Sequence, residues 1–241
     1  MKTTGQMKIE IPEQLRDVVR VGVKANREVP GSVALGGTVC SLFTHHRLSS
    51  DIDFVLTDLS KRFEEVREHL LQLPDWKESR VHVPVLILGS LEGFEIGYRQ
   101  MRRATPIETQ IIETPDGPLI IPTVEELLRT KAFLTYNRNY TRDFVDFAEL
   151  SCLFETSDVV DILSDLDERF RWEKQPTVLV EVIKKLLSPE PHDLEDTRYG
   201  FSQLRLLNPR LKSWDQVAER CREIGKELSV KILIKEKNET P

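Results

Sequence analysis

Cysteine is scarce in this sequence, and the few cysteines present form no recognised motif. The 241 residues include three cysteines, Cys40, Cys152 and Cys221, which lie far apart along the chain. There is no Cys-x-x-Cys pair and no Cys/His cluster, so neither a zinc site nor a disulfide framework is expected. An odd number of isolated cysteines is typical of reduced thiols in a cytoplasmic protein.

Long apolar runs are also missing. No stretch approaches the roughly 20 consecutive apolar residues that a membrane-spanning helix needs. The first fifteen residues lack the apolar core of a secretory signal peptide. We therefore expect cytoplasmic localisation and no membrane partner.

The chain has no excess of positive charge. Its 34 Lys and Arg against 40 Asp and Glu give a net charge of −6, which argues against binding nucleic acid through the overall field but allows a local basic groove. With 39% hydrophobic and 31% charged residues, the composition is that of a globular protein. Its length suffices for one large domain or two small ones.

Hydrophobic periodicity divides the chain near Pro122 into a mixed α/β half and a helical half. Helical spacing predicts helices over 13–27, 38–44, 61–73, from 123, from 141, and over 157–170, 177–187 and 213–232. Short β-type runs predict strands over 32–35, 51–56, 83–88, 94–98, 107–112 and 119–121. We predict an α+β fold in which residues 1–122 form the core. Residues 123–241 would form a helical half that packs on this core and completes its site.

The most informative stretch begins with a Gly-Gly-Thr turn between a predicted strand and a predicted helix. Gly36 and Gly37 would let backbone amides approach a phosphate without a Cβ in the way. The start of the following helix adds unpaired N–H groups, and Thr38 could add its hydroxyl. A lone Gly-Gly is most often only a turn, so this element needs support from its neighbours.

Support comes from an Asp-Ile-Asp triplet in the next predicted strand. Residues two apart in a strand share a face, so Asp51 and Asp53 should project together. Two adjacent carboxylates repel each other unless a cation lies between them, and magnesium suits such oxygen ligands together with substrate phosphates. A lone Asp-x-Asp is usually two surface acids, but its order and spacing after the glycines favour a site with two magnesium ions.

Gly-Gly-Thr followed by His-Arg-Leu-Ser-x-Asp-x-Asp resembles the first motif of the DNA polymerase β-type nucleotidyltransferase superfamily. In detail it is similar to the AbiEii-type toxins of abortive infection and type IV toxin–antitoxin systems. The resemblance covers roughly residues 32–150. It implies a polymerase β-type core, triphosphate binding at residues 36–38 and metal ions at the two aspartates. Arg47 matches the family arginine and would either neutralise phosphate or brace the turn.

A third carboxylate is usual in such sites, and the candidates are Glu95, Glu108 and Glu113. The stretch from Pro106 to Phe133 resembles the corresponding family segment, so we favour Glu108 as a third metal ligand. A solvent-facing glutamate at a sheet edge is the alternative for the same residue.

Lys131 lies at the edge of the buried stripe of its predicted helix, next to Leu127, Leu128 and Leu134. The resemblance implies that this lysine contacts the nucleotide phosphates and offsets charge as pyrophosphate leaves. The alternative is a solvated helix lysine, which is the usual environment of this residue type.

The segment Arg-Asn-x-Thr-Arg-Asp-x-x-Asp resembles the last motif of the AbiEii-type family. It places Arg142, Asp143 and Asp146 on one predicted helix. The resemblance implies that Arg142 and one aspartate help to form the site. Asp143 is preferred because it directly follows Arg142, but the sequence leaves Asp146 open. A surface array of ion pairs is the alternative.

These observations predict a magnesium-dependent nucleotidyltransferase that moves an NMP from an NTP to an acceptor hydroxyl. The resemblance implies a toxin with a cognate antitoxin protein, and tRNA is one candidate acceptor. Arg99, Arg102 and Arg103 could form a basic patch for such an acceptor, although a solvated loop is the commoner outcome. The alternatives are transfer to a small molecule such as an antibiotic, or a catalytically idle nucleotide-binding protein.

Overall fold

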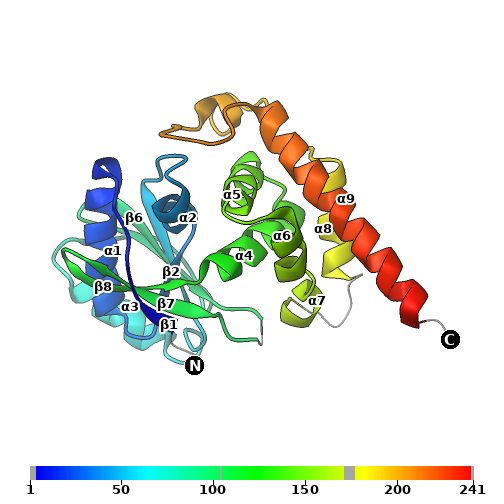
Figure 1. Cartoon of the computed structure of the whole chain (residues 1–241). Coiled ribbons are helices and arrows are strands. Elements are labelled where there is room, and N and C mark those ends of the chain that lie inside the picture. Colours follow the sequence, from blue (N-terminus) through cyan, green and yellow to red (C-terminus); the bar gives the residue numbers. More distant parts are fainter. Residues whose placement is uncertain (1–3, 104, 171–176, 240–241) are drawn as a thin grey trace. The chain divides into compact units, whose positions relative to one another are not determined.

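The structure, a computed structural model, describes residues 4–103, 105–170 and 177–239. The chain forms two compact units (Figure 1). Unit 1 comprises Met1–Arg102 and Pro106–Thr123, and unit 2 comprises Arg103–Thr105 and Val124–Pro241. Each unit has its own core and is described by itself.

Unit 1 is built around a mixed five-stranded sheet. In spatial order its strands are β2 (Val33–Leu35), β3 (Asp51–Leu56), β6 (Phe94–Gln100), β5 (Leu86–Leu91) and β4 (Trp76–His82). β3 runs parallel to β6, whereas all other neighbouring strands are antiparallel. β3 therefore lies between β2, which leads into the glycine turn, and β6.

The helices of unit 1 pack their apolar faces on this sheet. They are α1 (Arg16–Glu28), α2 (Gly37–Thr44) and α3 (Phe63–Gln72), and the 3-10 turn η1 (Glu13–Leu15) directly precedes α1. Gly22 of α1 lies so close to β3 that a Cβ there would be 2.7 Å from Cδ1 of Ile52. The absence of a side chain lets α1 approach the strand that carries the two aspartates.

A second, three-stranded sheet in unit 1 has the order β1 (Thr4–Lys8), β7 (Thr109–Thr114) and β8 (Gly117–Pro122). β7 and β8 form an antiparallel hairpin, and β1 adds to β7 in parallel. Neither β1 nor β4 is predicted from the sequence. β4 is an edge strand whose middle residues are polar and largely exposed, so it lacks the alternation by which a strand is recognised.

One predicted strand is shifted. Val83 to Val85 form the turn between β4 and β5, closed by a hydrogen bond from the Val85 amide to the His82 carbonyl at 2.8 Å. β5 consequently begins at Leu86, three residues after the predicted start at Val83.

Unit 2 is helical in its described part. Its helices are α4 (Val124–Asn137), α5 (Thr141–Ser151), α6 (Thr156–Leu163), α7 (Leu166–Arg169), α8 (Val178–Leu187), η2 (Phe201–Gln203) and α9 (Trp214–Glu239). The helix predicted over 157–170 is in fact two helices, α6 and α7. α9 runs along α8 (Figure 1). The predicted α+β class, a mixed sheet with flanking helices followed by a helical region, is confirmed.

None of the helices in the described part of the chain combines the length and the apolarity that crossing a bilayer requires.

Candidate functional site

The glycine turn connects β2 to α2 in a conformation that requires glycine. Gly36 caps α2 with φ 101° and ψ −166°, in a backbone region that is essentially restricted to glycine. The first turn of α2 begins at Gly37, so its N–H groups have no partner within the helix. Unpaired amides at a helix N-terminus can bind an anion such as a phosphate group.

Thr38 connects α2 to the strand with the aspartates. Its side chain is buried, and its hydroxyl donates a hydrogen bond to the Asp51 carbonyl oxygen at 2.5 Å. The hydroxyl is therefore used within the fold, so the contribution of α2 to phosphate binding would come from backbone amides.

Asp51 and Asp53 lie on the same face of β3, as their spacing predicts. Ile52 and Phe54 alternate with them and are buried in the core, whereas both aspartates are half-buried. One oxygen of each carboxylate has a partner: Ser49 Oγ donates to Asp51 Oδ1 at 2.6 Å, and Arg99 Nε donates to Asp53 Oδ1 at 3.2 Å. Their Oδ2 atoms accept no hydrogen bond from any residue that the structure describes.

Gly97 makes room for the Asp53 carboxylate, and the glycine turn lies next to it. Asp53 is paired with Leu35 of β2 on one side and with Gly97 of β6 on the other. A Cβ on Gly97 would overlap Asp53 Oδ1, and a Cβ on Gly36 would be 3.9 Å from Asp53 Oδ2. The structure thus brings the predicted glycine turn and the predicted carboxylate pair together.

Arg47 lies against the same turn. Its side chain is buried, it donates to the Leu48 carbonyl oxygen at 3.3 Å, and its guanidinium occupies the space that a Cβ on Gly37 would need. These contacts favour the bracing alternative for Arg47. The neighbouring His46 is also buried, with Nδ1 2.5 Å from Thr44 Oγ1.

The candidates for a third carboxylate differ in position. Glu108 is exposed and directly precedes β7 of the three-stranded sheet, where its carbonyl oxygen accepts from the Thr123 amide at 2.9 Å. Glu95 of β6 is exposed and paired directly with Asp51 across the β3–β6 ladder. Among the described residues, no group of three or more His, Cys, Asp or Glu side chains is arranged to hold a metal ion.

Lys131, Asp143 and Asp146 meet inside unit 2. The Lys131 side chain on α4 is 5% exposed, and its Nζ atom lies 3.0 Å from Asp143 Oδ1 and 2.7 Å from Asp146 Oδ2, both on α5. This burial excludes a solvated lysine and a surface array of ion pairs. Asp143 Oδ2 is buried and has no hydrogen-bond partner within the described residues.

Arg142 points away from this buried group. It is exposed, and its guanidinium lies over the Tyr140 ring at 5.4 Å from the centroid. Arg142 is therefore exposed to solvent, whereas the side chain of its neighbour Asp143 is buried.

The start of α5 is held by a residue that the sequence does not reveal. Asp193, from the segment between α8 and η2, accepts hydrogen bonds from the Thr141 amide and hydroxyl, each at 2.7 Å. An aspartate that caps a helix is usually found next to it in sequence, and this one lies 52 residues away. It fixes the turn of α5 that carries Asp143.

The predicted basic patch is not a single surface. Arg99 pairs with Asp53, whereas Arg102 is exposed. Arg103 is nearly buried in unit 2, with a guanidinium nitrogen 2.5 Å from Glu126 Oε1 and the group 4.9 Å from the centroid of the Phe170 ring.

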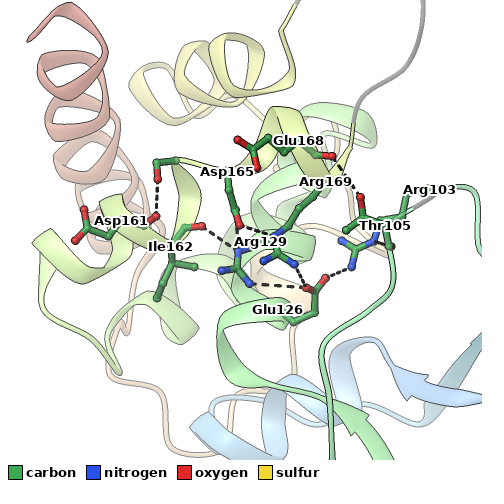
Figure 2. Close-up of polar contacts among 10 residues, drawn as sticks. Arg103, Thr105, Glu126, Arg129, Asp161, Ile162, Asp165, Glu168 and Arg169 are labelled. Carbon is green, nitrogen blue, oxygen red and sulfur yellow. Dashed lines mark hydrogen bonds and ion pairs between the residues drawn. The ribbon is translucent and has the colours of Figure 1, made fainter. Parts of the chain in front are cut away.

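Glu126 is the centre of the ionic cluster in which Arg103 takes part. Figure 2 shows Arg103, Arg129 and Arg169 pointing toward its carboxylate. Arg129 lies 3.8 Å and Arg169 3.2 Å from Oε2, and both also pair with Asp165. The cluster connects the segment around Arg103 with α4 and α7, and the sequence does not predict it.

Two comparisons with known proteins cover most of the chain. Residues 35–223 match the family model "Nucleotidyl transferase AbiEii toxin, Type IV TA system". The chain is also similar to the solved structure of MenT4, a nucleotidyltransferase toxin from Mycobacterium tuberculosis H37Rv. The TM-score is 0.53 at 16% identity, covering 90% of this chain and 86% of that one. This likeness shows a shared fold.

Curated relatives match a shorter part of the chain. The mycolic acid-containing lipids exporter MmpL11 of Mycolicibacterium smegmatis is 31% identical over 125 residues, which is 50% of this chain. The heme uptake protein MmpL11 of Mycobacterium tuberculosis is 29% identical over 123 residues, also 50% of this chain. The match spans only 12% of the length of each of these relatives.

Proposed function

Because the chain belongs to the AbiEii family of nucleotidyl transferase toxins of type IV toxin–antitoxin systems, we propose that it transfers an NMP from an NTP to an acceptor hydroxyl. The oxygen of the acceptor hydroxyl forms a bond to the α-phosphorus, and the bond from that phosphorus to the bridging oxygen breaks. Pyrophosphate leaves, and the hydroxyl proton passes to a base. The observation that carries this proposal is the contact between the glycine turn and the two aspartates of β3.

Asp51 and Asp53 are the residues that would hold magnesium. Their Oδ2 atoms lie on one face of β3 without a hydrogen bond to a described residue, and carboxylate oxygens are ligands that magnesium prefers. When bound, the metal supplies neutralisation of the phosphate charge and lowers the pKa of the attacking group. Two protein carboxylates are enough where substrate phosphates provide further ligands.

We propose separately that a glutamate provides a third protein ligand for the metal, and there are two candidates for it. Glu108 is the candidate suggested by the family resemblance. Glu95 has the stronger structural support, because it is paired directly with Asp51 on the neighbouring strand. Substitution of each glutamate distinguishes them.

The triphosphate would bind at the amides of Gly37 and Thr38, next to the bend that Gly36 allows. We propose that Lys131 and Arg142 contribute positive charge to nucleotide binding and that Asp143 takes part in the reaction. The buried ion pairs of Lys131 also give it a structural role in unit 2. Its two roles must therefore be separated by measuring folding and activity together.

The biological role proposed is that of a toxin controlled by a cognate antitoxin protein, in accordance with the family description. A tRNA is the first acceptor to test. A small molecule such as an antibiotic is the alternative acceptor, and both are compatible with the same residues of unit 1.

The experiment is a transfer assay with labelled NTPs, magnesium and total tRNA. The wild type is compared with Asp51→Asn and Asp53→Asn, and with Asp17→Asn as a matched control, because the Asp17 side chain is 80% exposed. We expect label on the acceptor with the wild type and Asp17→Asn, and background label with the other two or with EDTA.

Separation of the labelled products into RNA, protein and small molecules identifies the acceptor. Failure to label any of the three would refute the proposed activity. Label that persists in Asp51→Asn would refute the assignment of the metal ligands instead.

A further inference from the structure

Arg99 is a cation placed on one of the proposed metal ligands. It lies on β6, two residues beyond Gly97, and its Nε atom donates to Asp53 Oδ1 at 3.2 Å. Neither side chain is buried: Arg99 is 36% exposed and Asp53 is 23% exposed. The guanidinium therefore lies beside the carboxylate at a position that solvent reaches.

The ion pair between Arg99 and Asp53 reduces the repulsion between the two aspartates of β3 when no other cation is present. Asp51 and Asp53 project from the same face of one strand, and two such carboxylates repel each other when they are both ionised. Arg99 provides a positive charge that offsets this repulsion. A divalent ion at Asp53 would instead be repelled by the guanidinium, so the two cations compete for the same carboxylate.

We propose that Arg99 is a positioning residue that holds Asp53 in the nucleotide-free protein and moves to the triphosphate when the nucleotide brings in the metal. The inference rests on the proposed function, because it concerns the order in which that site is filled. A partly exposed ion pair is weak and easily exchanged. A guanidinium binds phosphate oxygens well, because its planar fork of N–H donors matches their geometry.

The movement of Arg99 from Asp53 to the triphosphate couples the binding of metal to the binding of nucleotide. In the absence of nucleotide, Arg99 lowers the affinity of the aspartates for a divalent ion. Once the triphosphate takes the guanidinium, Asp53 Oδ1 becomes available and metal affinity rises. By linkage the metal raises nucleotide affinity by the same factor.

The test measures manganese binding, with free Mn²⁺ followed by electron paramagnetic resonance and no nucleotide present. Arg99→Gln is compared with Arg102→Gln, which removes the same charge from an exposed arginine three residues along the chain. We expect Arg99→Gln to bind Mn²⁺ about two- to fivefold more tightly than the wild type. Arg102→Gln should match the wild type, and the gain should disappear in Arg99→Gln/Asp53→Asn.

Nucleotide binding provides the second measurement. We expect the KM for NTP of Arg99→Gln to rise about tenfold or more, because a hydrogen bond to a charged phosphate is lost. Arg99→Lys should recover part of the loss, since it keeps the charge but not the planar fork.

Equal Mn²⁺ affinity in Arg99→Gln and Arg102→Gln would overturn the inference, even if every variant transfers label. A gain that persists after Asp53→Asn would overturn it as well, because the competing cation would then not act at Asp53. The proposed function fails by a different result, namely no label transfer by the wild type. The manganese measurement does not depend on that assay.

Discussion

The buried amine of Lys131 is shared by two carboxylates, so its removal should destabilise unit 2. Lys131→Met keeps a long unbranched side chain and removes the charge. Asp143 and Asp146, with side chains 1% and 0% exposed, would then lose the ammonium group that lies 3.0 and 2.7 Å from their oxygens. Removing one partner of a buried ion pair costs about 3–5 kcal/mol, and we expect a loss of that size in the free energy of unfolding.

The triple variant Lys131→Met/Asp143→Asn/Asp146→Asn tests the cause of this loss. It removes all three charges together and leaves side chains of nearly the same volume. Replacing these three members of a buried ionic group together is less costly than removing the lysine alone, so the triple variant should recover about 2 kcal/mol relative to Lys131→Met. The substitutions would then be strongly non-additive, as expected for residues in direct contact.

The assay combines urea unfolding, followed by far-UV circular dichroism, with hydrogen exchange of the amides of α4 and α5. Exchange is needed because a chain with two compact units need not unfold in one step. Lys184→Met is the matched control. Lys184 likewise pairs with a carboxylate, that of Glu181 on its own helix at 2.7 Å, but the lysine side chain is 65% exposed. Its loss should cost less than about 1 kcal/mol.

Equal costs for Lys131→Met and Lys184→Met would refute the electrostatic interpretation of the buried group. A triple variant less stable than Lys131→Met would refute it too. If the expected loss is found, the activity of Lys131→Met must be corrected for the folded fraction before any loss is attributed to chemistry.

Three further predictions concern single positions. Gly97→Ala should lower transfer about 100-fold, because the new methyl group overlaps Asp53 Oδ1; a kcat/KM close to that of the wild type would contradict this. Glu95→Gln should raise the magnesium concentration needed for half-maximal activity more than Glu108→Gln does, since Glu95 is paired with the first aspartate of β3; the reverse order would restore Glu108 as the third ligand. Burial raises the pKa of the Cys221 thiol, and since the thiolate is the reactive form, native protein at pH 8 should be alkylated there only after addition of urea, as followed by mass spectrometry. Equal rates of Cys221 alkylation in native and unfolded protein would contradict the burial of this thiol.

Local patterns were sufficient where a structural element determines its own environment. The alternation of apolar residues with Asp51 and Asp53 predicts one shared face, and β3 has this arrangement. Lys131 was expected at the edge of a buried stripe and is buried. In each case the relevant neighbours lie within one turn or two residues, so the spacing contains the information.

Contacts between distant segments were not predictable in this way. β1 pairs with β7 through Thr4 and Gln110, and Asp193 caps a helix that begins at Thr141. Similarly, Arg99 meets Asp53 only because β3 and β6 are neighbours in one register. Such pairs depend on the order of strands and the packing of loops, for which the residues themselves carry no periodic signal.

The path of the chain through the two units restricts how they can be inherited or engineered. Arg103–Thr105 belong to unit 2, although the residues on both sides of them belong to unit 1. A single cut after Thr123 would therefore take Arg103 away from Glu126, and neither unit is encoded by one continuous stretch. Exchange of a unit between homologues needs three junctions, after residues 102, 105 and 123. A single crossover between residues 103 and 126 would join the Arg103 of one parent to the Glu126 of the other, so this ion pair would then have to form between residues from two different parents.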